Sequence, residues 1–582
     1  MKLRAAKAAA RSKPVPDIKP YLRAFYEGNR LRWTAAMAFN ILSTVNMLFC
    51  SWVLGAVIDA AAALDRARLF RLLWICGCFL PFAIVIGLGE TRCKTLFFRR
   101  AMEQYKSLAF RRLSEKSISA FSQENTGRYL STLTNDAVTI QTDYLNNSFT
   151  VVYSALQFCL ALLMMLGYSP LLTLSVVLFS VLPMAVSLLL GQGLTPREKA
   201  VSDQNERFVS LVKDLLGGFS VIKSFKAEEE ARSLFDESNS LIEEKRMERQ
   251  WWRGILNIAG GTAGFFMQFG VFFVGAFLAL RGSITSGTVL IFVNLCNCIL
   301  SPISDIPQYL SQRKAARALV EKLAGAVEEN TSRSGEPMEP VLQDAISLQN
   351  VTFGYEPEKP VLKDLSLTLN AGKKYALVGS SGSGKSTLLN LLMGGYDGYQ
   401  GSISLDGKEL RDIDPDSLYD LMSLMGQNVF LFDDTIRRNI TMFRDFPDQQ
   451  VSSAARRAGL APLLEEKGEN YICGENGGNL SGGERQRVSI ARCLLRGTPV
   501  LLLDEATAAL DNQTAFEVVD SLLKLEGLTR LVVTHRLEKG LLEQYDGIFV
   551  LRNGQLCETG TFEDLMSQKG YFYSLYNVTG EN

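Results

Sequence analysis

Residues that can bind a phosphate chain and activate a water molecule occur at fixed spacings in the C-terminal half of the chain. The motif GSSGSGKS (379–386) follows the apolar run KYALVG (374–379) and overlaps the helical run STLLNLLMG (386–394). In such a glycine-rich loop the backbone N–H groups surround phosphates, the lysine reaches the β- and γ-phosphates, and the serine hydroxyl can ligate Mg²⁺. The motif therefore predicts an ATP-binding P-loop, whose residues are Gly379, Ser380, Ser381, Gly382, Ser383, Gly384, Lys385, Ser386 and Thr387.

Two acids and the only histidine of the chain follow apolar, strand-like runs. Asp504 and Glu505 end the run LLLDE, and His535 follows RLVVT (530–534). Because α/β sheets bind their ligands at the carboxyl ends of the strands, these side chains are expected to meet the P-loop. Asp504 would then hold Mg²⁺ through water, and Glu505 would orient or deprotonate the attacking water. A histidine buried in the core is the alternative for His535, and its place at a strand end disfavours that alternative.

The N-terminal half contains long runs without any charged residue. A hydrocarbon core about 30 Å thick needs roughly 20 apolar helical residues, so each run is about long enough, or more than long enough, for one membrane span. The longest run breaks at Tyr168-Ser169-Pro170 and therefore holds two spans, which gives six predicted membrane helices. A buried core helix is the alternative for any single run, and six runs together disfavour it. The runs are 33–58, 72–89, 144–196, 254–280 and 282–304.

The charges around these runs predict the orientation of the chain. Residues 1–32 carry nine Lys or Arg and two acids, which favours a cytoplasmic N-terminus, and six crossings return the C-terminus to the same side. We therefore expect a multi-pass protein of the cell (plasma) membrane with both termini cytoplasmic. The charged segments 90–143 and 197–253 extend the membrane helices as long cytoplasmic hairpins, and we expect these to bend near Gly127 and at Gly217-Gly218.

A chain of 582 residues is too long for one compact core. Lys and Arg number 61 and so do Asp and Glu, so no global charge indicates a nucleic-acid partner. The expected fold class is an α-helical membrane domain plus an α/β P-loop ATPase domain. The expected order is a basic cytoplasmic segment at 1–32, a transmembrane domain with long cytoplasmic helical extensions at 33–312, a linker at 313–342 and a nucleotide-binding domain at 343–582.

Taken together, these motifs resemble an ATP-binding cassette (ABC) exporter-type half-transporter, in which a six-helix transmembrane domain is fused to a nucleotide-binding domain. The segment LSGGE (480–484) resembles the family signature, which distinguishes the family from other P-loop ATPases. In the family this signature completes the ATP site of a second, opposing domain. The resemblance therefore implies a partner half-transporter, whose nucleotide would be contacted by Ser481, Gly482 and Gly483.

The same resemblance implies roles for individual residues. Tyr355 would stack on adenine, and Gln427 would touch Mg²⁺ and relay to the membrane domain. Asp511 would link the two ATP sites, and His535 would hold the γ-phosphate. The implied catalytic residues are Glu505, His535 and Lys385, and the implied Mg²⁺ ligands are Ser386, Gln427 and Asp504.

Glu484 departs from the family pattern, which usually has Gln at this position. A carboxylate close to a γ-phosphate would be repelled, but the first turn of a helix favours an acid, so this side chain is expected to point away. Activity would be kept, while the site that the signature completes would be weakened. Glu505 and His535 are intact, so the chain would supply a normal half to one ATP site and an altered signature to the other. This inequality slightly favours a heterodimer over a homodimer.

The implied mechanism is alternating access driven by ATP binding and hydrolysis. A membrane path without charged residues at mid-depth favours export of an amphipathic or hydrophobic compound, a peptide or a lipid. One alternative is an importer built on the exporter fold, for example for a metal chelate, and another is a non-transporting, ATP-switched membrane sensor or regulator. The scattered amides of the spans serve either as interhelical hydrogen bonds or as substrate contacts; they are Asn40, Asn46, Gln157, Gln268, Asn294 and Asn297.

Overall fold

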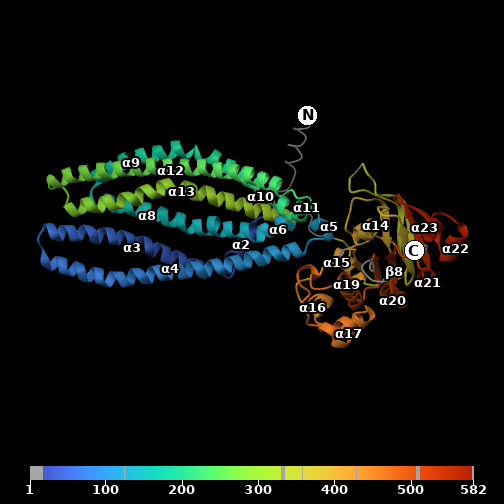
Figure 1. Ribbon diagram of the computed structural model, residues 1–582. Coiled ribbons are helices and arrows are strands. Elements are labelled where there is room, and N and C mark those ends of the chain that lie inside the picture. The colour runs from blue at the N-terminus through green and yellow to red at the C-terminus, as the bar shows by residue number, and fades with distance from the viewer. Residues whose placement is uncertain are drawn as a thin grey trace. The chain divides into compact units, whose positions relative to one another are not determined.

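The computed structural model describes residues 17–122, 126–328, 335–356, 358–427, 429–505 and 512–579. These residues form two compact units, which are described separately (Figure 1). The helical unit contains the described residues up to Arg112 and those from Thr126 to Ala326. The sheet unit contains the described residues from Leu113 to Ser122 and from Val327 onward.

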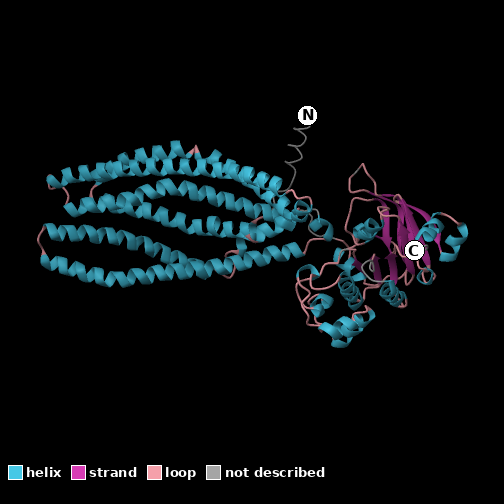
Figure 2. Ribbon diagram, viewed as in Figure 1, coloured by secondary structure: helices cyan, strands magenta, loops and turns pink. Residues whose placement is uncertain are grey.

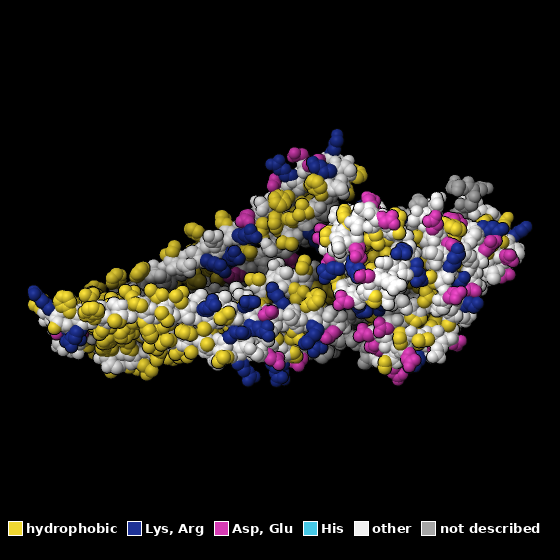
Figure 3. Space-filling view, turned by 90° about the horizontal axis from the view of Figure 1, so that it is seen from below, with side chains coloured by type: hydrophobic (Ala, Val, Ile, Leu, Met, Phe, Trp, Pro, Cys, Tyr) yellow, Lys and Arg dark blue, Asp and Glu magenta, His cyan; other side chains and the backbone are white. Residues whose placement is uncertain are grey.

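Six helices of the described chain are long and apolar enough to cross a membrane, which confirms the predicted number. Apolar side chains gather over one part of the helical unit, and Lys and Arg side chains lie at either end of it (Figure 3). The spans lie in α3 (Arg30–Ala62), α4 (Arg66–Ser114), α8 (Asn147–Tyr168), α9 (Pro170–Gly191), α12 (Glu228–Leu280) and α13 (Ser286–Glu328). Shorter helices are α2 (Lys19–Ala24), α6 (Thr126–Leu133), α7 (Asn135–Thr139), the π-helix η1 (Ile140–Asn146), α10 (Leu194–Gly217) and α11 (Phe219–Ser224).

The chain reverses between α8 and α9 where the sequence predicts a break. Ser169 is extended, with φ −159°, and its hydroxyl accepts a hydrogen bond from the backbone N–H of Leu172, which caps α9. Pro170 follows as the first helical residue, where its missing N–H costs nothing. The uncharged run 144–196 therefore forms two spans, as predicted.

At both predicted bends a long helix gives way to short ones. α10 ends at Gly217, and the six-residue helix α11 follows Gly218 directly, as expected. Near Gly127, α4 ends at Ser114, and two short helices follow: α5 (Ile118–Ser122), in the sheet unit, and α6, which contains Gly127. There the backbone N–H of Ile118 donates to the hydroxyl of Tyr419 at 3.4 Å. A glycine near the start of a helix does not by itself end that helix.

The linker begins later than predicted. α13 continues to Glu328, and the boundary between the units lies after Ala326. Residues 313–328 lose hydrophobicity but retain Ala, Leu, Lys and Glu, which favour helix, so the last membrane helix runs on through them. After the gap in the described chain, Glu336 already pairs with Ile413 of the sheet unit.

Polar contacts join helices of the helical unit. Gln268 donates to Asn297 at 2.8 Å between α12 and α13. The amide of Gln157 on α8 donates to the sulfur atoms of Met47 and Cys298, at 3.1 and 3.3 Å. These amides therefore make interhelical hydrogen bonds, one of the two roles that the sequence left open.

The sheet unit contains two sheets, with helices packed around them (Figure 2). The six-stranded sheet has the order β10-β9-β3-β8-β7-β6, in which only β10 is antiparallel to its neighbour. Its strands are β3 (Lys374–Gly379), β6 (Met422–Met425), β7 (Val500–Asp504), β8 (Thr529–Val533), β9 (Gly547–Arg552) and β10 (Gln555–Gly560). The antiparallel sheet has the order β2-β1-β4-β5, formed by β1 (Ala345–Phe353), β2 (Leu362–Asn370), β4 (Gln400–Leu405) and β5 (Lys408–Glu409).

Helices of the sheet unit pack on both faces of the parallel strands. Along β3, Ala376 and Val378 point into one apolar cluster, while Tyr375 and Leu377 point into the other. Strands buried on both faces are held rigidly, so the residues at their carboxyl ends are held too. The helices are α14 (Lys385–Leu392), α15 (Pro415–Leu421), α16 (Ile436–Thr441), α17 (Asp448–Arg457), α18 (Ala461–Lys467), α19 (Gly482–Arg496), α20 (Asn512–Leu523), α21 (Lys539–Leu542), α22 (Phe562–Gln568) and α23 (Tyr571–Thr579), with 3₁₀ turns η2 (Leu410–Asp412) and η3 (Glu475–Gly477).

Candidate functional site

The carboxyl ends of three adjacent strands bring the predicted motifs together. Leu503 on β7 pairs with Val532 on β8, and Val532 pairs with Ala376 on β3. The three strands are parallel, so the residues that follow these positions leave the sheet at one edge. The P-loop after β3, the acid pair after β7 and His535 after β8 therefore converge.

Glu505 is the centre of this convergence. His535 Nε2 lies 2.9 Å from Glu505 Oε1, and Gln427 Nε2 donates to Glu505 Oε2 at 2.9 Å. The backbone of Glu505 has φ +51°, a left-handed conformation that is uncommon for a residue with a side chain. A carboxylate that is fixed by two partners and a strained backbone is well suited to orient a water molecule.

The P-loop surrounds the ammonium group of Lys385. Lys385 Nζ donates to the carbonyl oxygens of Gly379 and Ser380, at 2.9 and 3.0 Å. Gly384 has φ +100°, and a Cβ added there would lie 2.6 Å from Leu362, so only glycine fits this turn. Burial lowers the pKa of Lys385, and the nearby acids Glu505 and Asp504 oppose that shift.

Two oxygen atoms at the site are buried without a partner. Asp504 Oδ1 and Ser383 Oγ have no hydrogen-bond partner within the part of the chain that the structure describes. Burial raises the pKa of Asp504; Glu505 adds to the rise, and a hydrogen bond from Ser386 opposes it. Carboxylate, hydroxyl and amide oxygen atoms are the ligands that a hard cation prefers, and buried oxygen atoms without a partner are available to it. These residues therefore fit Mg²⁺ chemically.

Tyr355 stands beside the P-loop helix with 58% of its surface exposed. Its hydroxyl lies 3.0 Å from the Thr387 hydroxyl on α14. Phe353 and Tyr396 each contact its ring nearly edge-on, with centroids 5.4 Å away. The ring is therefore held in place while part of it stays open. Tyr396 was missed by the sequence analysis, because nothing in its local pattern signals this contact.

The signature segment forms the start of α19 and does not join the site above. Ser481 is the N-cap of α19, with Gly482 and Gly483 in the first turn. Among the described residues, no hydrogen bond or ion pair links these three to Lys385 or Glu505. Asp511, the last predicted site residue, lies outside the described residues.

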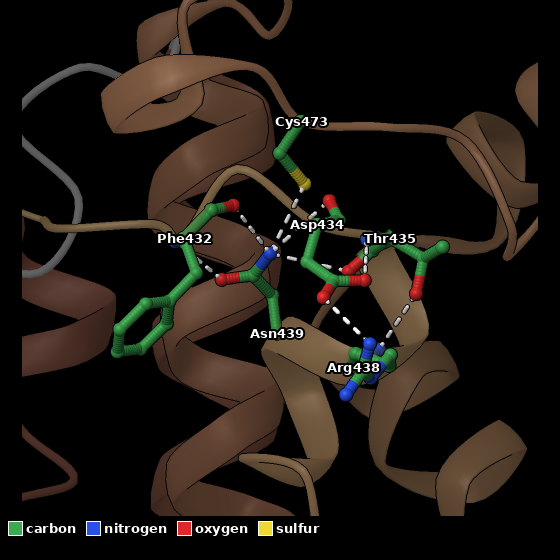
Figure 4. A network of polar contacts seen from close by, with 6 residues as sticks. All are labelled: Phe432, Asp434, Thr435, Arg438, Asn439 and Cys473. Carbon is green, nitrogen blue, oxygen red and sulfur yellow. Dashed lines mark hydrogen bonds and ion pairs between the residues drawn. The ribbon is translucent and has the colours of Figure 1, made fainter. Parts of the chain in front are cut away.

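A buried amide that the sequence analysis missed holds the loop that follows Gln427 (Figure 4). Asn439 is fully buried; its side chain accepts from the backbone N–H of Phe432 at 2.8 Å and donates to the carbonyl of the same residue at 2.9 Å. Its own backbone carbonyl accepts from Arg492 on α19, at 2.9 Å. Asn439 thus connects the loop to the signature helix. Only its burial marks it, and burial of an isolated asparagine is not visible in the sequence.

A P-loop, an acid pair and a histidine at adjacent strand ends define a nucleotide-hydrolysing P-loop ATPase domain. Its fusion to six helices that are long and apolar enough to cross a membrane defines a membrane-embedded ATPase.

Comparison with known proteins gives the family. The ABC transporter model matches residues 362–508, and the ABC transporter transmembrane region model matches 33–303. An ATP-dependent lipid A-core flippase of Vibrio cholerae is 31% identical over 503 residues, covering 84% of this chain and 85% of the relative. A beta-(1→2)glucan export ATP-binding/permease protein of Bartonella bacilliformis is 30% identical over 70% of both chains. The solved structure of a bacterial Atm1-family ABC exporter with ATP bound has a TM-score of 0.81 at 24% identity, covering 94% of this chain and 98% of that chain.

The chain belongs to the ABC transporter family. It is a half-transporter, with one six-helix transmembrane domain fused to one nucleotide-binding domain, and it couples ATP hydrolysis to transport across a membrane. A half-transporter acts as part of a dimer, so a second half-transporter and the lipid bilayer are its partners.

Proposed function

We propose that this half-transporter exports an amphipathic or hydrophobic compound, a peptide or a lipid, by ATP-driven alternating access. The observation that carries the proposal is the meeting of Glu505, His535 and Gln427 at the P-loop edge of the sheet, in a chain with six apolar helices. We further propose that it lies in the cell membrane with both termini cytoplasmic, which is the side on which ATP is available.

The proposed roles follow from the positions of the side chains. Lys385 and the N–H groups of the P-loop hold the β- and γ-phosphates, with His535 contacting the γ-phosphate. Glu505 orients or deprotonates the water molecule that attacks. Ser386, Gln427 and Asp504 would hold Mg²⁺, which neutralises charge on the phosphates when bound. Asp511 would link the two ATP sites of the dimer.

We propose that Ser481, Gly482 and Gly483 complete the ATP site of the partner half-transporter. The free N–H groups of a helix N-terminus bind phosphate, and in this chain the start of α19 has no bond to the chain's own P-loop residues among those described. A heterodimer is slightly favoured over a homodimer, because Glu484 alters the signature while Glu505 and His535 are intact.

The class of substrate is supported by the helical unit and by the relatives. The spans are mainly apolar, and Gln157, Gln268 and Asn297 form hydrogen bonds between helices, so the spans offer little to a free ion or a highly charged solute. One relative is named as a lipid A-core flippase, and another is named as a beta-(1→2)glucan export protein. An importer and a non-transporting regulator are the alternatives that the test must separate.

Vesicle transport tests the direction and the class. In proteoliposomes with the nucleotide-binding domains outside, external ATP should drive a nitrobenzoxadiazole-labelled phospholipid, an amphipathic dye or an apolar peptide inward, which corresponds to export. Protection of the label from an external quencher measures the movement, and the Glu505→Gln variant is the control. Outward movement would identify an importer. Ligand-stimulated ATP hydrolysis without movement of any of the three probes would identify a regulator.

Replacement of Tyr355 by Ala should weaken nucleotide binding about tenfold or more, because the loss of ring stacking costs roughly 1–3 kcal/mol. Trp or Phe at this position should largely restore the affinity, although Phe also loses the contact with Thr387. Titration with a fluorescent ATP analogue measures the dissociation constant. Equal affinities of the Ala and Trp variants would show that Tyr355 is a surface aromatic without a role in binding.

A further inference from the structure

Glu484 is the residue in which the signature departs from the family pattern, and the structure shows where its carboxylate lies. Glu484 Oε2 accepts from the backbone N–H of Ser481 at 2.6 Å, and the Ser481 hydroxyl accepts from the backbone N–H of Glu484 at 3.2 Å. This reciprocal pair is a capping box, which satisfies two free donors at the start of α19. The carboxylate therefore turns back onto the signature loop and stays beside Ser481.

The other carboxylate oxygen of Glu484 lies near a cationic side chain. Lys467 Nζ lies 3.6 Å from Glu484 Oε1, and the two side chains are 23% and 16% exposed. Burial alone would raise the pKa of Glu484, but the hydrogen bonds from Ser481 and the charge of Lys467 lower it below its ordinary value. The acid is thus ionised in the first turn of the signature helix, with its charge balanced from a different helix.

The position of Lys467 is fixed by its surroundings. It is the last residue of α18, which ends at Gly468 with φ +77°. Its ammonium also lies over the ring of Tyr471, 5.1 Å from the centroid. The backbone carbonyl of Tyr471 accepts from the N–H of Ile436 on α16 at 2.9 Å, so this turn is tied to a second helix. Because the segments on both sides of Lys467 are fixed, its ammonium group stays close to the carboxylate of Glu484.

The charge balance matters where the signature meets a phosphate. Ser481 and the N–H groups that follow it are the groups proposed to contact the nucleotide of the partner half-transporter. An uncompensated carboxylate hydrogen-bonded to Ser481 would repel that nucleotide, and the repulsion is strong in a site from which water is excluded. A Gln at this position, as in most of the family, could accept the same capping bond without a charge.

We propose that Lys467 is a positioning residue for ATP hydrolysis, which neutralises Glu484 so that the capped signature loop can approach the partner's nucleotide. The inference rests on the proposed function, because it needs the signature to complete a site. It also assigns a specific compensation for the altered signature, which limits how far Glu484 weakens the ATP site that the signature completes.

A double-mutant cycle tests this proposal in the assembled transporter in lipid. Lys467→Met should raise the KM for ATP about five- to tenfold, because it leaves Glu484 uncompensated. The same substitution should change the KM less than about twofold when Glu484→Gln is also present. Lys467→Arg should keep most of the affinity, since it retains the charge.

The opposite results are equally clear. If Lys467→Met causes the same loss with Glu484 and with Gln at 484, Lys467 acts only by anchoring α18, and the proposal is overturned. Should Lys467→Met fail to fold, Lys467→Gln replaces it in the cycle, and thermal unfolding verifies that each variant is folded.

The Ser481→Ala variant separates this inference from the proposed function. If that variant leaves the KM for ATP unchanged, the signature completes no site; if it raises the KM while the cycle shows no coupling, only the role of Lys467 is wrong.

Discussion

Glu505→Gln should lower steady-state ATP hydrolysis by about 10² or more, while ATP still binds and holds the dimer closed. The amide keeps the shape of the side chain, so the 2.9 Å contacts to His535 and Gln427 can re-form. What is lost is the negative charge that prepares water for attack. Phosphate release measures turnover, and a fluorescent ATP analogue measures binding.

A matched control for this substitution is Glu543→Gln. Glu543 is an exposed acid of the same unit, paired with Lys539 at the surface. It should change turnover less than about twofold, because surface ion pairs contribute little. Near-normal ATP hydrolysis by Glu505→Gln would refute the role of Glu505, whatever the control shows.

Ser481→Ala should have the second largest effect, and its size reports on the partner. In a homodimer both ATP sites depend on Ser481, so this variant should lose turnover about as deeply as Glu505→Gln. In a heterodimer the signature of this chain serves only the site whose P-loop belongs to the partner. Glu505→Gln should then abolish turnover, while Ser481→Ala leaves much of it. We expect the heterodimer pattern, and equal losses from the two variants would contradict it.

The substitution also removes an N-cap, so it needs a control for stability. Loss of a capping Ser or Thr costs about 1 kcal/mol of stability. Thr561→Ala removes the equivalent capping box of α22, where Thr561 and Asp564 bond reciprocally. If Ser481→Ala acts only through stability, the two variants should shift the melting temperature and the activity alike. A loss of turnover in Ser481→Ala that is not found in Thr561→Ala assigns the effect to the hydroxyl.

Much of the sheet unit could be predicted because local signals and tertiary structure agree. The apolar run KYALVG (374–379) is β3, and the apolar run that leads to Asp504 is β7. Asp406-Gly407 joins β4 to β5 with φ +47° and +79°, as a tight hairpin requires. In each case the chemistry that forms the element lies within a few residues.

The bounds of helices were harder to predict, because hydrophobicity and helix formation are different properties. The run 313–328 is charged, and this predicts a linker, yet its residues form helix readily and extend α13 to Glu328. Gly127 predicts a nearby bend, and α4 does end before it, at Ser114, but the glycine itself lies inside the short helix α6. Single residues are weak evidence when a tertiary contact, such as that between Ile118 and Tyr419, can stabilise another segment.

The sequence by itself determined which residues carry the chemistry: a P-loop, an acid pair, one histidine and a signature with an altered last residue. It also determined six membrane spans, because about 20 apolar residues without charge have few other stable environments. Tertiary structure decided which of these residues meet. The order β3-β8-β7 brings Glu505 to His535, while α18 and α19 bring Lys467 to Glu484, 17 positions away in sequence. These contacts depend on how strands and helices pack across the unit, and the local pattern of residues does not specify that packing.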